Sequence, residues 1–147
     1  SKAHGMAGAR VGYAIGHPAL IGAFDKIRNH FGMCRVSQAG ALAALSDQAH
    51  LAATREKVAT ARAGIARIAR ANGLAPLPSA TNFVTIDAGG DGALARRLVG
   101  ELAARGVFVR MPFVAPHDRC IRISCGRPED LALLAAALPE ALDAARR

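Results

Sequence analysis

The sequence predicts an α/β fold, in which short strands alternate with helices. Residues 82–87 and 120–125 alternate between apolar and polar side chains, a pattern typical of half-buried strands. Between them, residues 93–105 carry apolar side chains at helical spacing and are followed by a glycine, which commonly ends a helix. Of the 147 residues, 52% are apolar, which is enough for a chain of this length to bury a core. We therefore expect a small layered α/β body in this part of the chain.

The first half of the chain is expected to be mainly helical after one short strand. Residues 11–15 alternate between larger apolar residues and Gly or Ala, which predicts a strand. Pro18 suits the first turn of a helix that ends before Gly32. Ser37 is placed to cap a long helical tract, which Asn72 and Gly73 end.

A loop with two prolines is expected to join two structural layers or domains. Pro76 and Pro78 both lie in the run 74–80, where neither can continue a helix. We expect residues 1–72 to be the end of one domain together with an interdomain helix. Residues 73–147 are then expected to form a smaller α/β domain.

Two further elements are expected after the turn at Gly106. Residues 107–110 are rich in β-branched and aromatic side chains and are predicted to form a second short strand. Pro128 opens a final helix, and the acidic side chains of Glu129 and Asp130 interact favourably with the dipole of its first turn. The second half of the chain is therefore predicted to run strand, helix, strand, strand, helix.

Charge and hydropathy argue against binding to nucleic acid and against a membrane helix. A formal net charge of +8 is found in many nucleic-acid-binding proteins. Here the Lys and Arg residues are spread over several segments, and aromatic residues that could stack on bases do not interleave with them. Nucleic-acid binding is therefore not expected. A membrane helix is not expected either, because no apolar run approaches the roughly 20 residues that a span needs.

The cysteines and histidines predict neither a metal site nor a disulfide framework. Cys34, Cys120 and Cys125 form no CxxC pair, and the five histidines show no ligand spacing. Each cysteine is expected to be a small buried residue. Three such cysteines fit a protein of the reducing cytoplasm.

The first ten residues carry the densest group of chemically useful side chains. Lys2 lies in a loop of small residues, and Arg10 follows eight positions later. An uncharged lysine amine can form an imine with an aldehyde cofactor, and a guanidinium is a forked donor to phosphate. Ser1 offers a hydroxyl, and the glycines of the loop allow the backbone to approach a phosphate. A lysine in such a loop is also common as a solvated surface residue, so the residues alone leave both interpretations open.

A family resemblance favours the catalytic interpretation. The string SKxxxMAGxRxGY at residues 1–13 resembles the lysine signature of the class I and II aminotransferases of fold type I, and especially their histidinol-phosphate aminotransferase branch. In that signature the lysine carries pyridoxal 5′-phosphate (PLP) as a Schiff base, and the serine and arginine bind its phosphate. The resemblance implies these roles for Lys2, Ser1 and Arg10.

Arg122 is the second candidate, within the predicted strand 120–125. Its neighbours Ile121 and Ile123 are expected to point to the opposite face of the strand. By itself, an arginine on the polar face of a strand is often structural. The segment resembles the LRIxxG strand of the same family, whose arginine binds the α-carboxylate of the substrate through a bidentate pair. The resemblance implies this role for Arg122.

Two intermediate segments extend the resemblance over nearly the whole chain. Residues 78–84 are similar to the family's SxxNF segment, and residues 106–112 are similar to its GVxVRP segment. Met111 between the arginine and the proline, and Cys125 before the final glycine, depart from the pattern. These departures weaken the match to any single subfamily.

The resemblance implies that this is the C-terminal part of a PLP-dependent transferase fold: the end of the large domain and the small α/β domain. The implied reaction moves an amino group between an L-amino acid and a 2-oxo acid. Histidinol phosphate and aromatic amino acids are both open as substrates. The aspartate that binds the pyridine nitrogen precedes the lysine in this family, so we expect it in a segment before residue 1. The family also implies a homodimer with shared sites, and Arg35 lies where residues often face the partner.

Two alternative functions remain open on the sequence. One is a PLP-dependent lyase or decarboxylase on the same scaffold. The other is an aminotransferase-like sensor domain of a transcription regulator, which would require a DNA-binding segment upstream.

Overall fold

The chain divides into two compact units, Ser1–Arg55 and Glu56–Arg147, called here the N-terminal and C-terminal units. The computed structural model describes residues 2–147. The domain boundary that the sequence predicts between residues 72 and 73 concerns the domains of the complete fold and stays a prediction.

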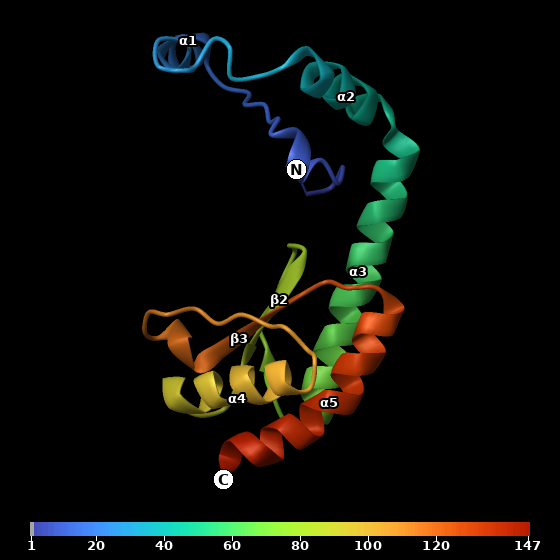
Figure 1. The fold of residues 1–147 in the computed structure, drawn as a ribbon, viewed down its shortest axis with the longest axis vertical. Coiled ribbons are helices and arrows are strands. Elements are labelled where there is room, and N and C mark those ends of the chain that lie inside the picture. The colour runs from blue at the N-terminus through green and yellow to red at the C-terminus, as the bar shows by residue number, and fades with distance from the viewer. Residues whose placement is uncertain (1) are drawn as a thin grey trace. The chain divides into compact units, whose positions relative to one another are not determined.

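The N-terminal unit is built from short helices joined by extended chain. It contains η1 (Ala7–Ala9), α1 (Pro18–Asp25) and α2 (Arg35–Ser46), shown in Figure 1. Pro18 opens α1 as predicted, and the ring of His17 accepts a hydrogen bond from the second helical amide. The expected strand at residues 11–15 is wrong, because no described residue pairs with its backbone groups and a strand requires such pairing.

The long helical tract is two helices rather than one. α3 (Gln48–Ala71) begins directly after Asp47, whose backbone leaves the helical conformation between α2 and α3. The carboxylate of Asp47 accepts the amide N–H of His50 at 2.9 Å, so it caps α3 and competes with a continuous helix. The prediction that Ser37 caps this tract is also wrong: Cys34 caps α2, and its Sγ accepts the N–H of Ser37 at 3.4 Å. Cys34 is exposed, against the expectation that it is buried.

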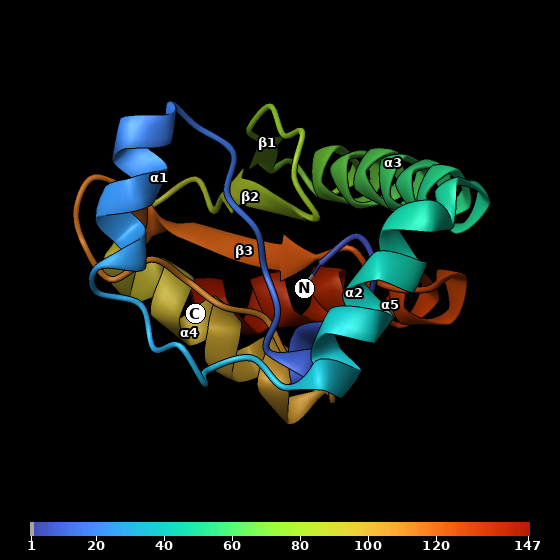
Figure 2. The same cartoon turned by 90° about the horizontal axis from the view of Figure 1, so that it is seen from above.

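The C-terminal unit is a three-stranded antiparallel sheet packed against helices. The strand order is β1-β2-β3, and all pairings are antiparallel. Figures 1 and 2 show α4 and α5 together on one side of this sheet. The elements after α3 are β1 (Ala75–Pro76), β2 (Phe83–Asp87), α4 (Gly92–Ala104), η2 (His117–Arg119), β3 (Cys120–Ser124) and α5 (Pro128–Arg146). Strands 82–87 and 120–125 and the two helices after Gly90 are therefore confirmed, each within one or two residues.

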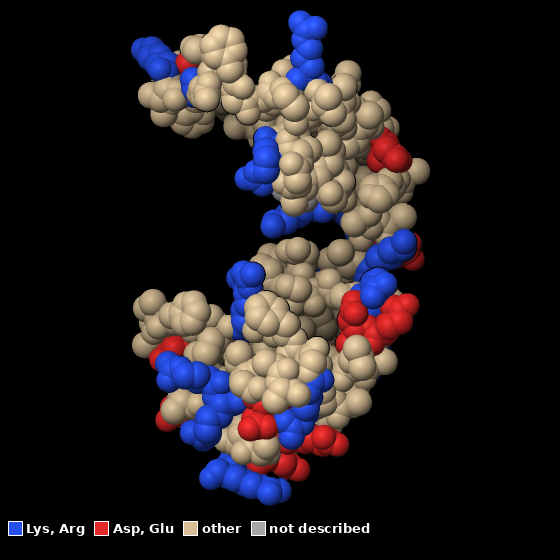
Figure 3. All heavy atoms as spheres, viewed as in Figure 1, with Lys and Arg blue, Asp and Glu red and all other residues tan. Residues whose placement is uncertain are grey.

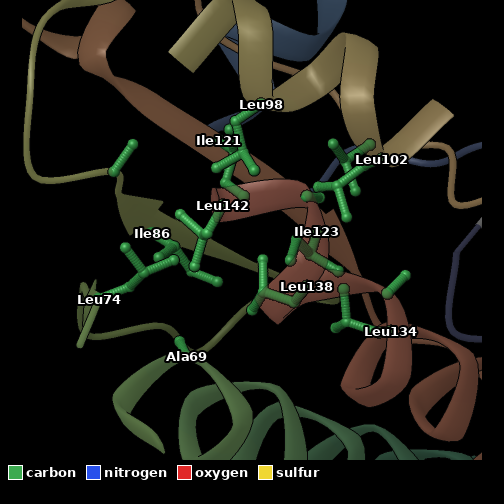
Figure 4. Close-up of a cluster of buried hydrophobic side chains, with 14 of the residues drawn as sticks. Ala69, Leu74, Ile86, Leu98, Leu102, Ile121, Ile123, Leu134, Leu138 and Leu142 are labelled. Atoms are coloured by element: carbon green, nitrogen blue, oxygen red, sulfur yellow. The ribbon is translucent and has the colours of Figure 1, made fainter. Parts of the chain in front are cut away.

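One apolar core holds the C-terminal unit together. The buried side chains of β2 and β3 point toward α4 and α5, as Figure 4 shows. The second half of α3 contributes to the same core. The main members are Ile65, Ala69, Leu74, Val84, Ile86, Leu98, Leu102, Ile121, Ile123, Leu134, Leu138 and Leu142.

The helix ends in this unit follow the sequence signals. Gly73 has a φ of 71°, and the following amide of Leu74 bonds back to the carbonyl of Ala69 at 3.0 Å, which closes α3 as predicted. Asp91 caps α4. Asp130 accepts the backbone N–H of Arg127 at 2.8 Å at the start of α5.

The expected strand at residues 107–110 is reduced to a single bridge between Arg110 and Arg122. Pro112, two residues later, has no backbone N–H to donate, so the pairing does not extend into a ladder.

Charged side chains are dispersed over the C-terminal unit. Lys and Arg lie among Asp and Glu on the face of this unit that Figure 3 shows. Ion pairs such as that of Arg119 with Asp87 account for part of the arrangement. None of the helices in residues 2–147 has both the length and the apolar character needed to span a membrane.

Replacing Leu138 tests the core. Leu138 is fully buried on α5, so Leu138→Ala is expected to lower the free energy of unfolding by about 2–5 kcal/mol. Leu133→Ala on the same helix is the control, because Leu133 is 61% exposed, and it is expected to cost less than about 1 kcal/mol. Urea denaturation measures both. Equal losses in the two variants would contradict the assigned core.

Acid titration tests the pair of Asp87 and Arg119. The guanidinium of Arg119 and the amide of Gly89 both donate to the carboxylate, which lowers the pKa of Asp87 from its ordinary value of 3.8. Because the folded pKa is the lower one, the stabilisation is complete above pH 3.8 and is lost as the pH falls through the lowered pKa. Asp87→Asn is expected to flatten this part of the stability profile, whereas Asp143→Asn, at an exposed site on α5, is expected to keep it.

Candidate cofactor and substrate site

The loop from Lys2 to Arg10 is closed by its own backbone. The N–H of Gly5 donates to the carbonyl of Lys2 at 3.1 Å, and the N–H of Ala9 donates to the carbonyl of Met6 at 3.2 Å. Gly5 has a φ of 64°, which a residue with a side chain adopts only at a cost. Lys2 is exposed.

Arg10 is held in an uncommon backbone conformation. Its φ of 48° makes it the one non-glycine residue with positive φ among those described. Such a conformation costs of order 1–3 kcal/mol. Residues that adopt it cluster at active sites and ligand-binding sites. One terminal nitrogen of its guanidinium donates to the carbonyl of Ala7 at 2.9 Å. The side chain is exposed, and its other N–H donors have no partner within residues 2–147.

Ser37 fastens this loop to α2. Its hydroxyl donates to the carbonyl of Ala9 at 2.6 Å, across 28 positions of sequence. Close packing continues one turn later, where a Cβ on Gly40 would lie 3.1 Å from the terminal methyl of Met6. Sequence reasoning treated Ser37 only as a helix cap. No local signal in the sequence indicates a contact over this separation.

A largely apolar pocket of about 500 Å³ lies beside the loop, within the N-terminal unit. Nδ1 of His4 is buried and has no hydrogen-bond partner in the described part of the chain. The lining includes His4, Met6, Val11, Tyr13, Met33 and Leu42.

Arg122 lies on the face of β3 opposite to the core. Ile121 and Ile123 are 0% and 6% exposed, so the predicted alternation is confirmed and Arg122 points away from the core. Arg122 is paired with Thr85 of β2 and is half-buried. Its guanidinium carbon lies 4.9 Å from the centre of the Phe83 ring. Within residues 2–147 no carboxylate forms an ion pair with it.

A second arginine, missed by sequence reasoning, joins Arg122 on this face. The N–H of Arg110 donates to the carbonyl of Arg122 at 3.1 Å, and the N–H of Arg122 donates back at 2.6 Å. Residues paired in this way carry their side chains on the same face of a sheet. Val109 is buried, so alternation alone predicts that Arg110 points outward, but not that it pairs with Arg122.

The predicted site residues are divided between the two units. Lys2 and Arg10 share one loop of the N-terminal unit, and Arg122 belongs to the C-terminal unit. Ser1 lies outside the described residues. Arg35 is the first residue of α2 and is exposed.

Comparison with a solved structure defines the class of fold. The crystal structure of histidinol-phosphate aminotransferase from Sinorhizobium meliloti, in complex with PLP, matches with a TM-score of 0.92 and 55% identity over 97% of this chain and 39% of that one. The described chain therefore has the fold of part of a PLP-dependent aminotransferase, as the sequence predicted.

The family follows from the sequence match. The model of the aminotransferase class I and II family matches residues 1–138, so the chain belongs to this family. Histidinol-phosphate aminotransferase 2 of Ralstonia nicotianae is 39% identical over 97% of this chain. An aromatic amino acid aminotransferase of Mycobacterium avium is 36% identical over 85% of it. The chain spans 38% and 37% of the lengths of these two relatives.

Removing the hydroxyl of Ser37 tests how the lysine loop is held. Ser37→Ala is expected to make amide hydrogen exchange in residues 2–10 about fivefold faster, because a hydrogen bond contributes about 1 kcal/mol. Ser46→Ala is the control, because its hydroxyl bonds only to the carbonyl of Leu42 on the same helix. Mass spectrometry measures the exchange. Equally slow exchange of residues 2–10 in both variants would show that Ser37 does not hold the loop.

Proposed function

We propose that this chain is part of a PLP-dependent aminotransferase, which moves an amino group between an L-amino acid and a 2-oxo acid. The observation that carries the proposal is the placement of Lys2 and Arg10 on one closed loop, in a chain that belongs to the class I and II aminotransferases along residues 1–138. The cofactor bound by the Sinorhizobium meliloti enzyme supports the choice of PLP.

The donor set of the loop fits this cofactor. Lys2 supplies a primary amine for the aldehyde of PLP, and Arg10 supplies free guanidinium N–H groups for its phosphate. Ser1 is proposed as a further phosphate donor. The Cβ that could be added at Gly8 meets nothing within 4 Å, so the backbone there leaves open space for a bound group. When bound, PLP withdraws electrons from the substrate carbon and so makes its proton acidic.

Lys2 is proposed to act as the acid and base of the reaction. In the complete site Lys2 would hold PLP through its amine, and the same amine would take up and return the proton of the substrate Cα. Lys2 is exposed within the described residues, so this role requires further polypeptide to enclose it.

Arg122 is proposed to bind the anionic end of the substrate. Its planar guanidinium suits a bidentate pair with a carboxylate, and that pair fixes the orientation of the Cα–H bond. Arg110 on the same face adds a second charge, and two guanidinium groups suit a doubly charged group such as a phosphate. Histidinol phosphate, whose anionic end is a phosphate, and an aromatic amino acid, whose anionic end is a carboxylate, are both compatible with this pair.

We further propose a homodimer in the cytoplasm. Large apolar side chains of the N-terminal unit are exposed, as expected of a surface that packs against further polypeptide, whether of the same subunit or of a partner. They include Ile15, Phe24, Ile27 and Phe31. Three free cysteines support a reducing compartment.

Replacing Lys2 tests the proposed reaction. In the complete polypeptide with PLP, Lys2→Ala is expected to lower formation of keto acid from an amino-acid donor and 2-oxoglutarate by at least about 1000-fold, because both imine and proton transfer are lost. Lys57→Ala on α3 is the control and is expected to keep full activity.

Two results would contradict the proposal. Unchanged transamination in Lys2→Ala would remove Lys2 from the site. Release of carbon dioxide from the amino acid without formation of keto acid would instead identify a decarboxylase.

A further inference from the structure

The guanidinium carbon of Arg122 lies over an aromatic ring. It is 4.9 Å from the centroid of the Phe83 ring, well within the range of about 6 Å over which a cation is attracted to a ring face. Phe83 is half-buried on β2. The contact therefore joins the two strands on the face that carries Arg122.

The register of the sheet places Phe83 and Arg122 within reach of each other. Phe83 is paired with Ser124, and Thr85 is paired with Arg122, so Phe83 and Arg122 are diagonal neighbours on one face. A diagonal spacing is within reach of an aromatic ring and a long side chain. The intervening residues Val84 and Ile123 are buried in the core. Neither Phe83 nor Arg122 can change face without disrupting that core.

The contact with the ring leaves the guanidinium N–H groups available to an anion. The ring contacts Arg122 from one side, and the N–H bonds of a guanidinium lie in the plane of that group. A carboxylate accepts hydrogen bonds in that same plane. Since none of the carboxylates in residues 2–147 pairs with Arg122, these donors are not used within the described chain.

We infer that Phe83 is a positioning residue, which orients Arg122 for the anionic end of the substrate. The inference rests on the proposed aminotransferase function and adds a residue to that site. Arg110 lacks comparable support: its guanidinium carbon is 5.9 Å from the ring of Phe108, which is 80% exposed. The two arginines therefore differ, and Arg122 is the one whose orientation is set in advance.

Binding of 2-oxoglutarate tests this inference without turnover. Calorimetric titration into the complete polypeptide in its PLP form gives a dissociation constant for each variant. Phe83→Leu is expected to raise this constant about three- to tenfold, which corresponds to one cation–π contact. Phe83→Tyr keeps the ring and is expected to stay within about twofold of wild type. Thr85→Val, on the same strand face, is the matched control and is also expected to stay within about twofold.

A double-mutant cycle distinguishes positioning from general packing. If Phe83 acts through Arg122, Phe83→Leu has no further effect on affinity when Arg122→Gln is already present. Thermal denaturation accompanies each titration, and Phe83→Met replaces Phe83→Leu if the latter fails to fold.

Different results would overturn the inference on Phe83 and the proposed function. Unchanged affinity in Phe83→Leu, equal losses in Phe83→Leu and Phe83→Tyr, or the same loss in the Arg122→Gln background would overturn the inference alone. A wild-type protein that binds neither PLP nor 2-oxoglutarate would overturn the proposed function, and the inference with it.

Discussion

The pairing of β2 with β3 is the constraint on which the C-terminal unit depends. Val84 is paired with Ile123 and Ile86 with Ile121, and all four are buried against α4 and α5. Because side chains alternate along a strand, this arrangement forces Arg122 onto the other face. A slip of one residue would bury the arginine and expose the isoleucines. The pairing of β2 with β3 therefore builds the core and also places the Arg122 guanidinium on the face opposite to it.

The N-terminal unit is ordered in a different way. None of its described residues is buried, and its lysine loop is held by hydrogen bonds within the loop and by the contact between Ser37 and Ala9. Polar contacts of this kind contribute about 1 kcal/mol each, much less than a packed core. This difference agrees with the proposal that the exposed apolar side chains of this unit pack against further polypeptide. It also means that the chemistry proposed for Lys2 depends on surroundings beyond the loop.

Sequence reasoning succeeded where the determining signals are local. Proline and glycine signals placed the start of α1 and the end of α3, and alternation placed Arg122 on the open face. It failed where partners distant in sequence decide. Residues 11–15 have the alternation of a strand but no described partner. One local signal was also missed: the carboxylate of Asp47 accepts the N–H of His50 and so separates two helices, although the helical spacing of apolar residues runs through this point. Arg110 was missed because its position beside Arg122 depends on a bridge between separate segments.

The lysine that carries the cofactor can be mapped chemically. The chain has three lysines, Lys2, Lys26 and Lys57. Reduction of the complete PLP-loaded polypeptide with borohydride converts an imine into a stable secondary amine, which peptide mass spectrometry locates. We predict a pyridoxyl group on Lys2. A group on Lys26 or Lys57 with Lys2 unmodified would contradict it, as would the absence of any modified peptide.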